Sequence, residues 1–162
     1  MWDVGTHQRT NDMVARDPGR PTPSVLYDIG VMYGYQSLDA WKRAHQAAML
    51  VLRETSGSNH PRTFALFDQL RRAALSVPAN IVEGYALGTP ALYRKHLRIA
   101  LGSAAETEYF LRVAADLGYL PAGVAKAGEE LLGGAMRALY GLIRRPESHR
   151  LSHTPHPTPH AS

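Results

Sequence analysis

Two stretches of this chain carry polar side chains whose types and spacing could do chemistry. On a helix, the stretch 69–84 places five of them on one face: Gln69, Arg72, Ser76, Asn80 and Glu83. The stretch 96–106 places Ser103 and Glu106 within an otherwise apolar stripe. Burying an unpaired carboxylate is costly, so we expect Glu106 to meet a hydrogen-bond donor of the first stretch. The candidate donors are Arg72, Ser76 and Asn80. We also expect Gly102 to let the two helices approach closely.

Three interpretations of this polar cluster remain open. It could be a buried network that fixes helix register, a ligand pocket with Glu106 as a catalytic acid, or a contact between subunits. Carboxylate and amide oxygens suit hard cations, but the chain lacks the Glu-x-x-His pairs of di-iron bundles. Ser103 has no neighbouring base in the helix, so hydrolysis is not expected. We therefore predict no metal site, no cofactor and no enzymatic activity.

Basic residues offer a second kind of chemistry. Residues 37–145 hold 14 Lys and Arg against 9 Asp and Glu, which favours anionic partners such as RNA or DNA. The candidate contacts are Lys42, Arg43, Arg71, Arg72, Arg94, Lys95, Arg98 and Arg112. Because the sequence has no recognition-helix, ribonucleoprotein or zinc-finger motif, binding should be to the nucleic-acid backbone and should weaken steeply with salt. An ordinary solvated basic face is the alternative.

Two amphipathic helices are predicted in the first half of residues 37–145. The first starts at an N-cap, Ser37, and ends at Ser56 and Gly57; its buried stripe is Leu38, Trp41, His45, Ala48 and Leu52. The second runs from Pro61 to Gly84 and should bend near Pro78. Its apolar stripe is Phe67, Leu70, Ala74, Val77 and Ile81.

Two further helices follow. The third opens at Thr89 and Pro90 and closes at Gly118; its stripe is Leu92, His96, Ile99, Ser103, Glu106, Phe110 and Leu117. The fourth follows Pro121 and depends on Val124, Leu131, Ala135, Leu139 and Leu142. We predict it to be the weakest, because each glycine in it costs about 1 kcal/mol relative to alanine; these are Gly128, Gly133, Gly134 and Gly141. Short connections predict an all-α, antiparallel up-down-up-down four-helix bundle.

The two ends differ in composition from this bundle at 37–145. Residues 1–36 are predicted to be a flexible leader, in which Met32 is a candidate translation start, and the His- and Pro-rich residues 146–162 a disordered tail. The chain has no cysteine, and no stretch approaches the ~20 apolar residues of a membrane span. We therefore expect a soluble protein of the cytoplasm with no membrane partner.

The polar motifs resemble the four-helix-bundle family of 23S rRNA intervening-sequence proteins. The motif Q-x-x-R-A-x-x-S-x-x-x-N-I-x-E-G occupies 69–84 and G-S-x-x-E occupies 102–106, between an opening at 38–44 and a Gly-Tyr-Leu turn at 118–120. The resemblance covers 36–145. It identifies these as signature residues that hold helices or subunits together: Ser76, Asn80, Glu83, Gly84, Gly102, Ser103 and Glu106.

The resemblance also implies partners. Proteins of this kind assemble as homopentamers, and a related branch contains the accessory proteins of diversity-generating retroelements, which bind nucleic acid and a reverse transcriptase. By similarity, the arginine-rich surface of the second and third helices would face RNA or DNA, and the partner would be a reverse transcriptase or another nucleic-acid enzyme. The alternative is a protein–protein interaction module with no nucleic-acid role.

Overall fold

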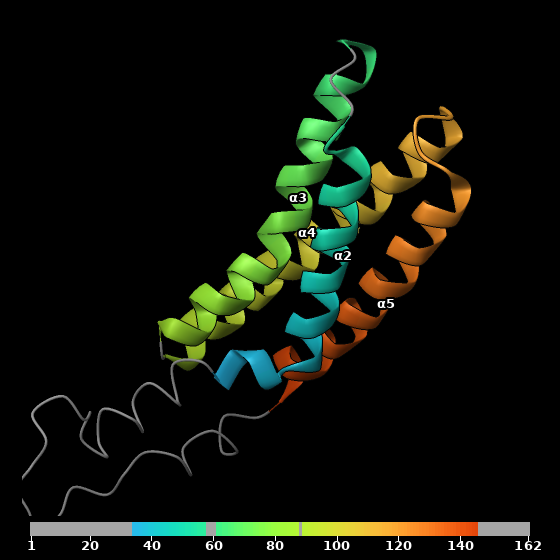
Figure 1. The fold of residues 1–162 in the computed structure, drawn as a ribbon. Helices are drawn as coiled ribbons and strands as arrows, with labels where there is room; N and C mark the ends of the chain where they lie inside the picture. Colours follow the sequence, from blue (N-terminus) through green and yellow to red (C-terminus); the bar gives the residue numbers. More distant parts are fainter. Residues whose placement is uncertain (1–33, 58–60, 88, 146–162) are drawn as a thin grey trace, which may run out of the picture. The chain divides into compact units, whose positions relative to one another are not determined.

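The computed structural model describes residues 34–57, 61–87 and 89–145, and its helices form an antiparallel bundle (Figure 1). The elements are a short 3₁₀ helix, η1 (Gly34–Ser37), and four long helices: α2 (Asp39–Thr55), α3 (Pro61–Ala86), α4 (Pro90–Asp116) and α5 (Ala122–Arg144). Both α2 and α4 pack on α3 and on α5. The predicted fold class is confirmed. The predicted leader, apart from 34–36 in η1, and the predicted tail lie outside the described residues.

The centre of the bundle is apolar and tightly filled. The predicted stripe of α3 is confirmed, because all five of its members are buried. Leu97 and Leu111 of α4 and Leu132 and Leu139 of α5 face them from the other side. The α3 helix continues through Pro78, so the loss of one backbone hydrogen bond does not end it.

The buried face of α2 differs from the prediction. His45 is exposed, and Leu38, Trp41 and Leu52 are only partly buried. The fully buried face consists of small residues: Ala40, Ala44, Ala47, Ala48 and Val51. Alanines let neighbouring helices approach, and the large side chains then cover the edges of the contact. The start of α2 was also wrongly predicted, because Leu38 occupies the N-cap position.

The buried face of α4 lies one residue further along than predicted. His96 and Ser103 are buried as predicted, and the other buried residues of the helix are Tyr93, Leu97, Ala100, Ala104, Thr107, Leu111 and Ala114. Leu92, Ile99 and Leu117, which were predicted to be buried, are exposed. The ends of the helix agree with prediction: the Thr89 hydroxyl accepts a hydrogen bond from the Leu92 N–H at 3.3 Å, and Gly118 has a φ of +70°.

The glycines of α5 do not shorten it, contrary to our expectation of a weak helix. It runs for 23 residues. A Cβ added at Gly128 would lie 2.5 Å from Cδ1 of Leu111 on α4, and one added at Gly134 would lie 2.7 Å from Cδ of Arg43 on α2. These two glycines therefore create the space in which α5 packs against both neighbours.

Candidate functional site

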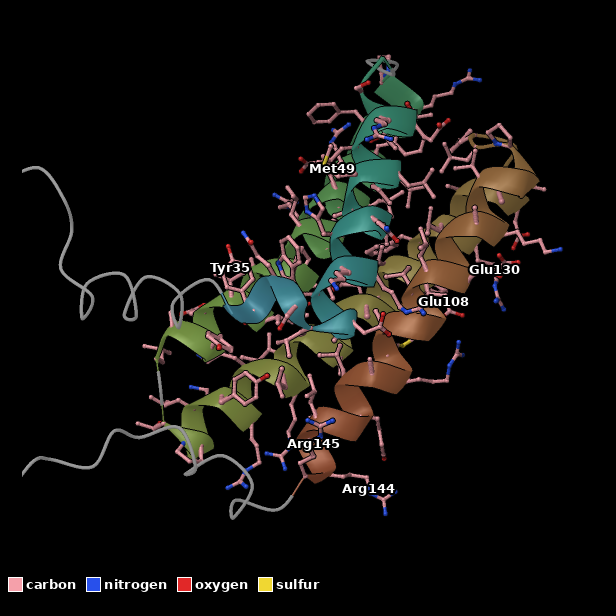
Figure 2. The ribbon with its side chains drawn as sticks, turned by 60° about the horizontal axis from the view of Figure 1, so that its bottom comes forward. Tyr35, Met49, Glu108, Glu130, Arg144 and Arg145 are labelled. Atoms are coloured by element: carbon pink, nitrogen blue, oxygen red, sulfur yellow. The ribbon has the colours of Figure 1, made fainter. Side chains whose placement is uncertain are left out.

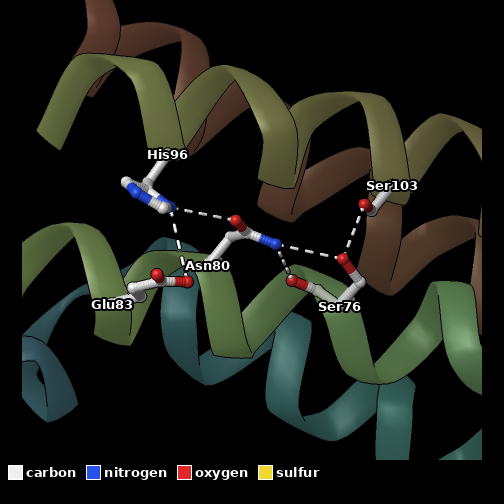
Figure 3. Close-up of polar contacts among 5 residues, drawn as sticks. All are labelled: Ser76, Asn80, Glu83, His96 and Ser103. Atoms are coloured by element: carbon white, nitrogen blue, oxygen red, sulfur yellow. Dashed lines mark hydrogen bonds and ion pairs between the residues drawn. The ribbon is translucent and has the colours of Figure 1, made fainter. Parts of the chain in front are cut away.

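A chain of polar side chains lies where α3 meets α4, and we call it the polar seam: Ser76, Asn80, Glu83, His96 and Ser103 (Figure 3). The Asn80 Nδ2 donates to the Ser76 carbonyl oxygen at 2.9 Å and to its Oγ at 3.0 Å. The two serine hydroxyls, Ser76 and Ser103, are 3.0 Å apart. At the other end, His96 Nδ1 lies 3.1 Å from Asn80 Oδ1. The seam thus joins the two helices through three side chains of α3 and two of α4.

The direction of these hydrogen bonds determines which ring nitrogen of His96 acts as a donor. A backbone carbonyl can only accept, so the amide nitrogen of Asn80 must face Ser76 and its oxygen must face His96. The imidazole therefore donates from Nδ1. The Glu83 carboxylate lies 3.6 Å from the same nitrogen. Each of the five side chains contacts another member of the seam, so its geometry supports the structural interpretation.

Two signature residues do not join the seam, which corrects two predictions. Glu106 is exposed rather than buried, and no described residue forms an ion pair or hydrogen bond with it. Gly102 is also exposed, and a Cβ there would meet nothing within 4 Å. The one-residue rotation of α4 turns both residues outward. Gly84 instead provides the close approach, because a Cβ there would lie 2.8 Å from Cβ of His96.

The arrangement does not support a catalytic role for Glu106 or Ser103. Ser103 contacts a second serine, not an imidazole or a carboxylate, among the described residues. An open groove of about 330 Å³ lies elsewhere, lined by residues of α2 and by Leu131 of α5, and neither Glu106 nor the seam borders it. No group of His, Asp and Glu within the described ranges could hold a metal ion.

Four of the eight predicted nucleic-acid contacts are engaged in ion pairs or hydrogen bonds within the chain. Arg43 pairs with Asp39 at 2.8 Å and Arg72 with Asp68 at 2.9 Å. Arg112 pairs with Glu129 at 3.1 Å and lies 3.7 Å from Glu108. Arg71 donates to the Thr55 carbonyl oxygen at 3.2 Å. Of the other four, Arg94 is partly buried and has a contact of its own, and none of the described carboxylates pairs with exposed Lys42, Lys95 or Arg98.

The packing of α4 on α5 brings positively charged side chains of the two helices together. The Arg112–Glu129 pair and the approach of Gly128 to Leu111 set the register of these antiparallel helices. Segment 90–105 therefore lies beside segment 135–145. The two segments contain six cations and no Asp or Glu, and we call these cations the basic end: Arg94, Lys95, Arg98, Arg137, Arg144 and Arg145.

The rest of the α4–α5 pair is acidic. Segments 106–116 and 122–134 contain five carboxylates against two cations, Arg112 and Lys126. Figure 2 shows Arg144 and Arg145 together at the end of α5, with Glu108 and Glu130 further along the bundle. The sequence analysis missed Arg137, Arg144 and Arg145. Comparing the charges of 90–105 and 135–145 as antiparallel partners could have found them.

A family model described as "23S rRNA-intervening sequence protein" matches residues 36–141 of this chain. The matched range includes the whole polar seam and α5 as far as Gly141. No curated protein matches the chain. No helix of the described residues is long and apolar enough to cross a membrane.

Proposed function

This chain belongs to the 23S rRNA-intervening sequence protein family, and on that premise we propose that it is a non-enzymatic, oligomeric bundle that binds RNA or DNA backbones through its basic end. The observation that carries the proposal is the six cations of segments 90–105 and 135–145, which no carboxylate interrupts. Nucleic acids present closely spaced phosphates, and cations arrayed on adjacent helices can neutralise several of them at once. Contacts of this kind position a nucleic acid without reading its sequence.

The proposal includes several copies of the chain and an enzymatic partner. The family resemblance supports a homopentamer, and repeated basic ends in one assembly would raise the overall affinity without any new contact. Such a platform would serve as an accessory factor for a nucleic-acid enzyme such as a reverse transcriptase. The outer face of α4 supports self-association, because Leu92 and Ile99 are 37% and 41% exposed there.

A pair of double variants with equal changes in net charge tests the proposal. Arg98→Glu with Arg144→Glu reverses two cations of the basic end. Arg53→Glu with Lys126→Glu reverses two exposed cations elsewhere on α2 and α5. In a salt titration against labelled RNA and DNA, the first pair should weaken binding strongly and lower the slope of log affinity against log salt by about 2 or more. The second pair should keep the wild-type slope.

The results that would contradict the proposal are equally definite. Equal losses of affinity in both double variants would mean that only net charge matters. Unchanged binding in the variant with Arg98→Glu and Arg144→Glu would place the contact elsewhere. If the wild-type protein binds neither RNA nor DNA at low salt, the basic end is solvated surface. The bundle would then be a protein–protein interaction module.

A further inference from the structure

We infer that Tyr140 of α5 stacks on an unpaired nucleobase, so that the basic end takes single-stranded RNA or DNA rather than a duplex. The inference rests on the proposed function and names its substrate class. It starts from an aromatic ring that has no structural use. Tyr140 is 57% exposed. Its ring and hydroxyl have no ring contact or hydrogen bond with any described residue.

The neighbours of Tyr140 on α5 are cationic. Arg137 precedes it by three residues and Arg144 follows it by four, so all three side chains lie on one face, about one turn apart. Gly141 follows Tyr140 and carries no side chain, and a Cβ there would meet nothing within 4 Å. Tyr140 is thus an exposed aromatic residue between two arginine positions on one face of α5, the helix that packs against α4.

This arrangement matches the chemistry of single strands. Proteins that bind single-stranded nucleic acid combine cations that follow the backbone with aromatic rings on which bases stack. Arg137 and Arg144 would contact phosphates on either side of the nucleotide whose base covers Tyr140. In a duplex the faces of the bases are occupied by their neighbours, so an exposed tyrosine gains nothing from a base-paired ligand.

Another exposed tyrosine lacks these surroundings and provides a matched control. Tyr109 of α4 is 63% exposed, but Glu106 and Glu108 flank it, and its ring lies 5.7 Å from that of Phe110. Carboxylates at this position would repel a phosphate backbone. Tyr109 is similarly exposed but has carboxylates beside it, and the cation one turn away, Arg112, is paired with Glu129. It therefore separates base stacking from the general effect of removing a surface aromatic ring.

The test uses the full chain with two probes, a labelled oligothymidylate and a DNA duplex of the same length. Tyr140→Ala should weaken affinity for the single strand about tenfold and leave affinity for the duplex within about twofold. Tyr140→Phe keeps the ring and should bind like wild type, as should Tyr109→Ala. The mass in solution and the thermal unfolding of each variant should equal those of the wild type.

Three outcomes would overturn the inference while leaving the proposed function intact. Tyr140→Ala could bind the single strand as well as wild type, could lose affinity equally for both probes, or could change the mass in solution, which would place the ring in a subunit contact. If wild type binds neither these probes nor RNA in a salt-dependent manner, the proposed function fails and the inference falls with it.

Discussion

Asn80 is the residue on which the polar seam depends. Its amide donates to Ser76 twice and accepts from His96 once, so a single side chain uses most of its hydrogen-bonding capacity at the contact between α3 and α4. Glu106 is the opposite case. The resemblance places it among the signature residues, yet it is exposed and contacts no described partner.

The first stability prediction contrasts these two residues. Asn80→Ala removes three hydrogen bonds at a half-buried contact and should lower the free energy of unfolding by about 1–3 kcal/mol. Glu106→Gln should change it by no more than about 0.5 kcal/mol, as is usual for exposed positions. Urea denaturation of both variants measures the difference. A loss at Glu106 as large as that at Asn80 would show that its carboxylate is buried against another copy of the chain.

At the scale of single helices, the sequence predicted the number, order and ends of the four α-helices better than their buried faces. Phe67, Leu70 and Ile81 mark the core face of α3 because they are large, apolar and regularly spaced. On α4, Leu92 and Ile99 have the same pattern but point outward, while the buried face contains small residues such as Ala100, Ala104 and Ala114. Hydrophobic spacing alone cannot distinguish these faces, because it does not show how closely the helices approach.

The glycines of α5 give the second stability prediction. Gly128→Ala should destabilise the bundle by about 1–3 kcal/mol, because the added methyl group would overlap buried Leu111. Gly141→Ala should stabilise it by up to about 1 kcal/mol, because its position is open and alanine favours the helix. Thermal or urea unfolding of the two variants checks the signs. If both variants were stabilised, helix propensity and not packing would determine how these glycines affect the free energy of unfolding.

At the scale of the whole molecule, charge is organised by topology rather than by sequence order. The cations of 90–105 and 135–145 are separated in the chain by segments that contain five carboxylates. The antiparallel turn between α4 and α5 brings the two basic segments together. The sequence analysis predicted a basic domain and three of these cations, Arg94, Lys95 and Arg98. It did not place Arg144 beside them, because it did not compare the two segments as antiparallel partners across the short turn between α4 and α5.

The outer face of α4 gives the last prediction, which concerns assembly. Gly102 lies in the middle of a helix, where glycine is unfavourable, and no described residue uses the space above it. Exposed Ile99 lies one turn away. A small residue beside an exposed apolar side chain suits close contact with another copy of the chain. Gly102→Leu should therefore shift the protein to smaller species in sedimentation experiments across a range of concentrations.

Gly141→Leu is the control for this experiment, because that glycine is also exposed, has open space above it and lies on α5. It should keep the wild-type mass, since leucine is a good helix former and meets no neighbour there. If the wild type is purely monomeric, or if both variants have the same mass in solution, the outer face of α4 is not a subunit contact. If only Gly102→Leu forms smaller species, a contact between copies of the chain explains the glycine at this position, because nothing within the single chain requires it.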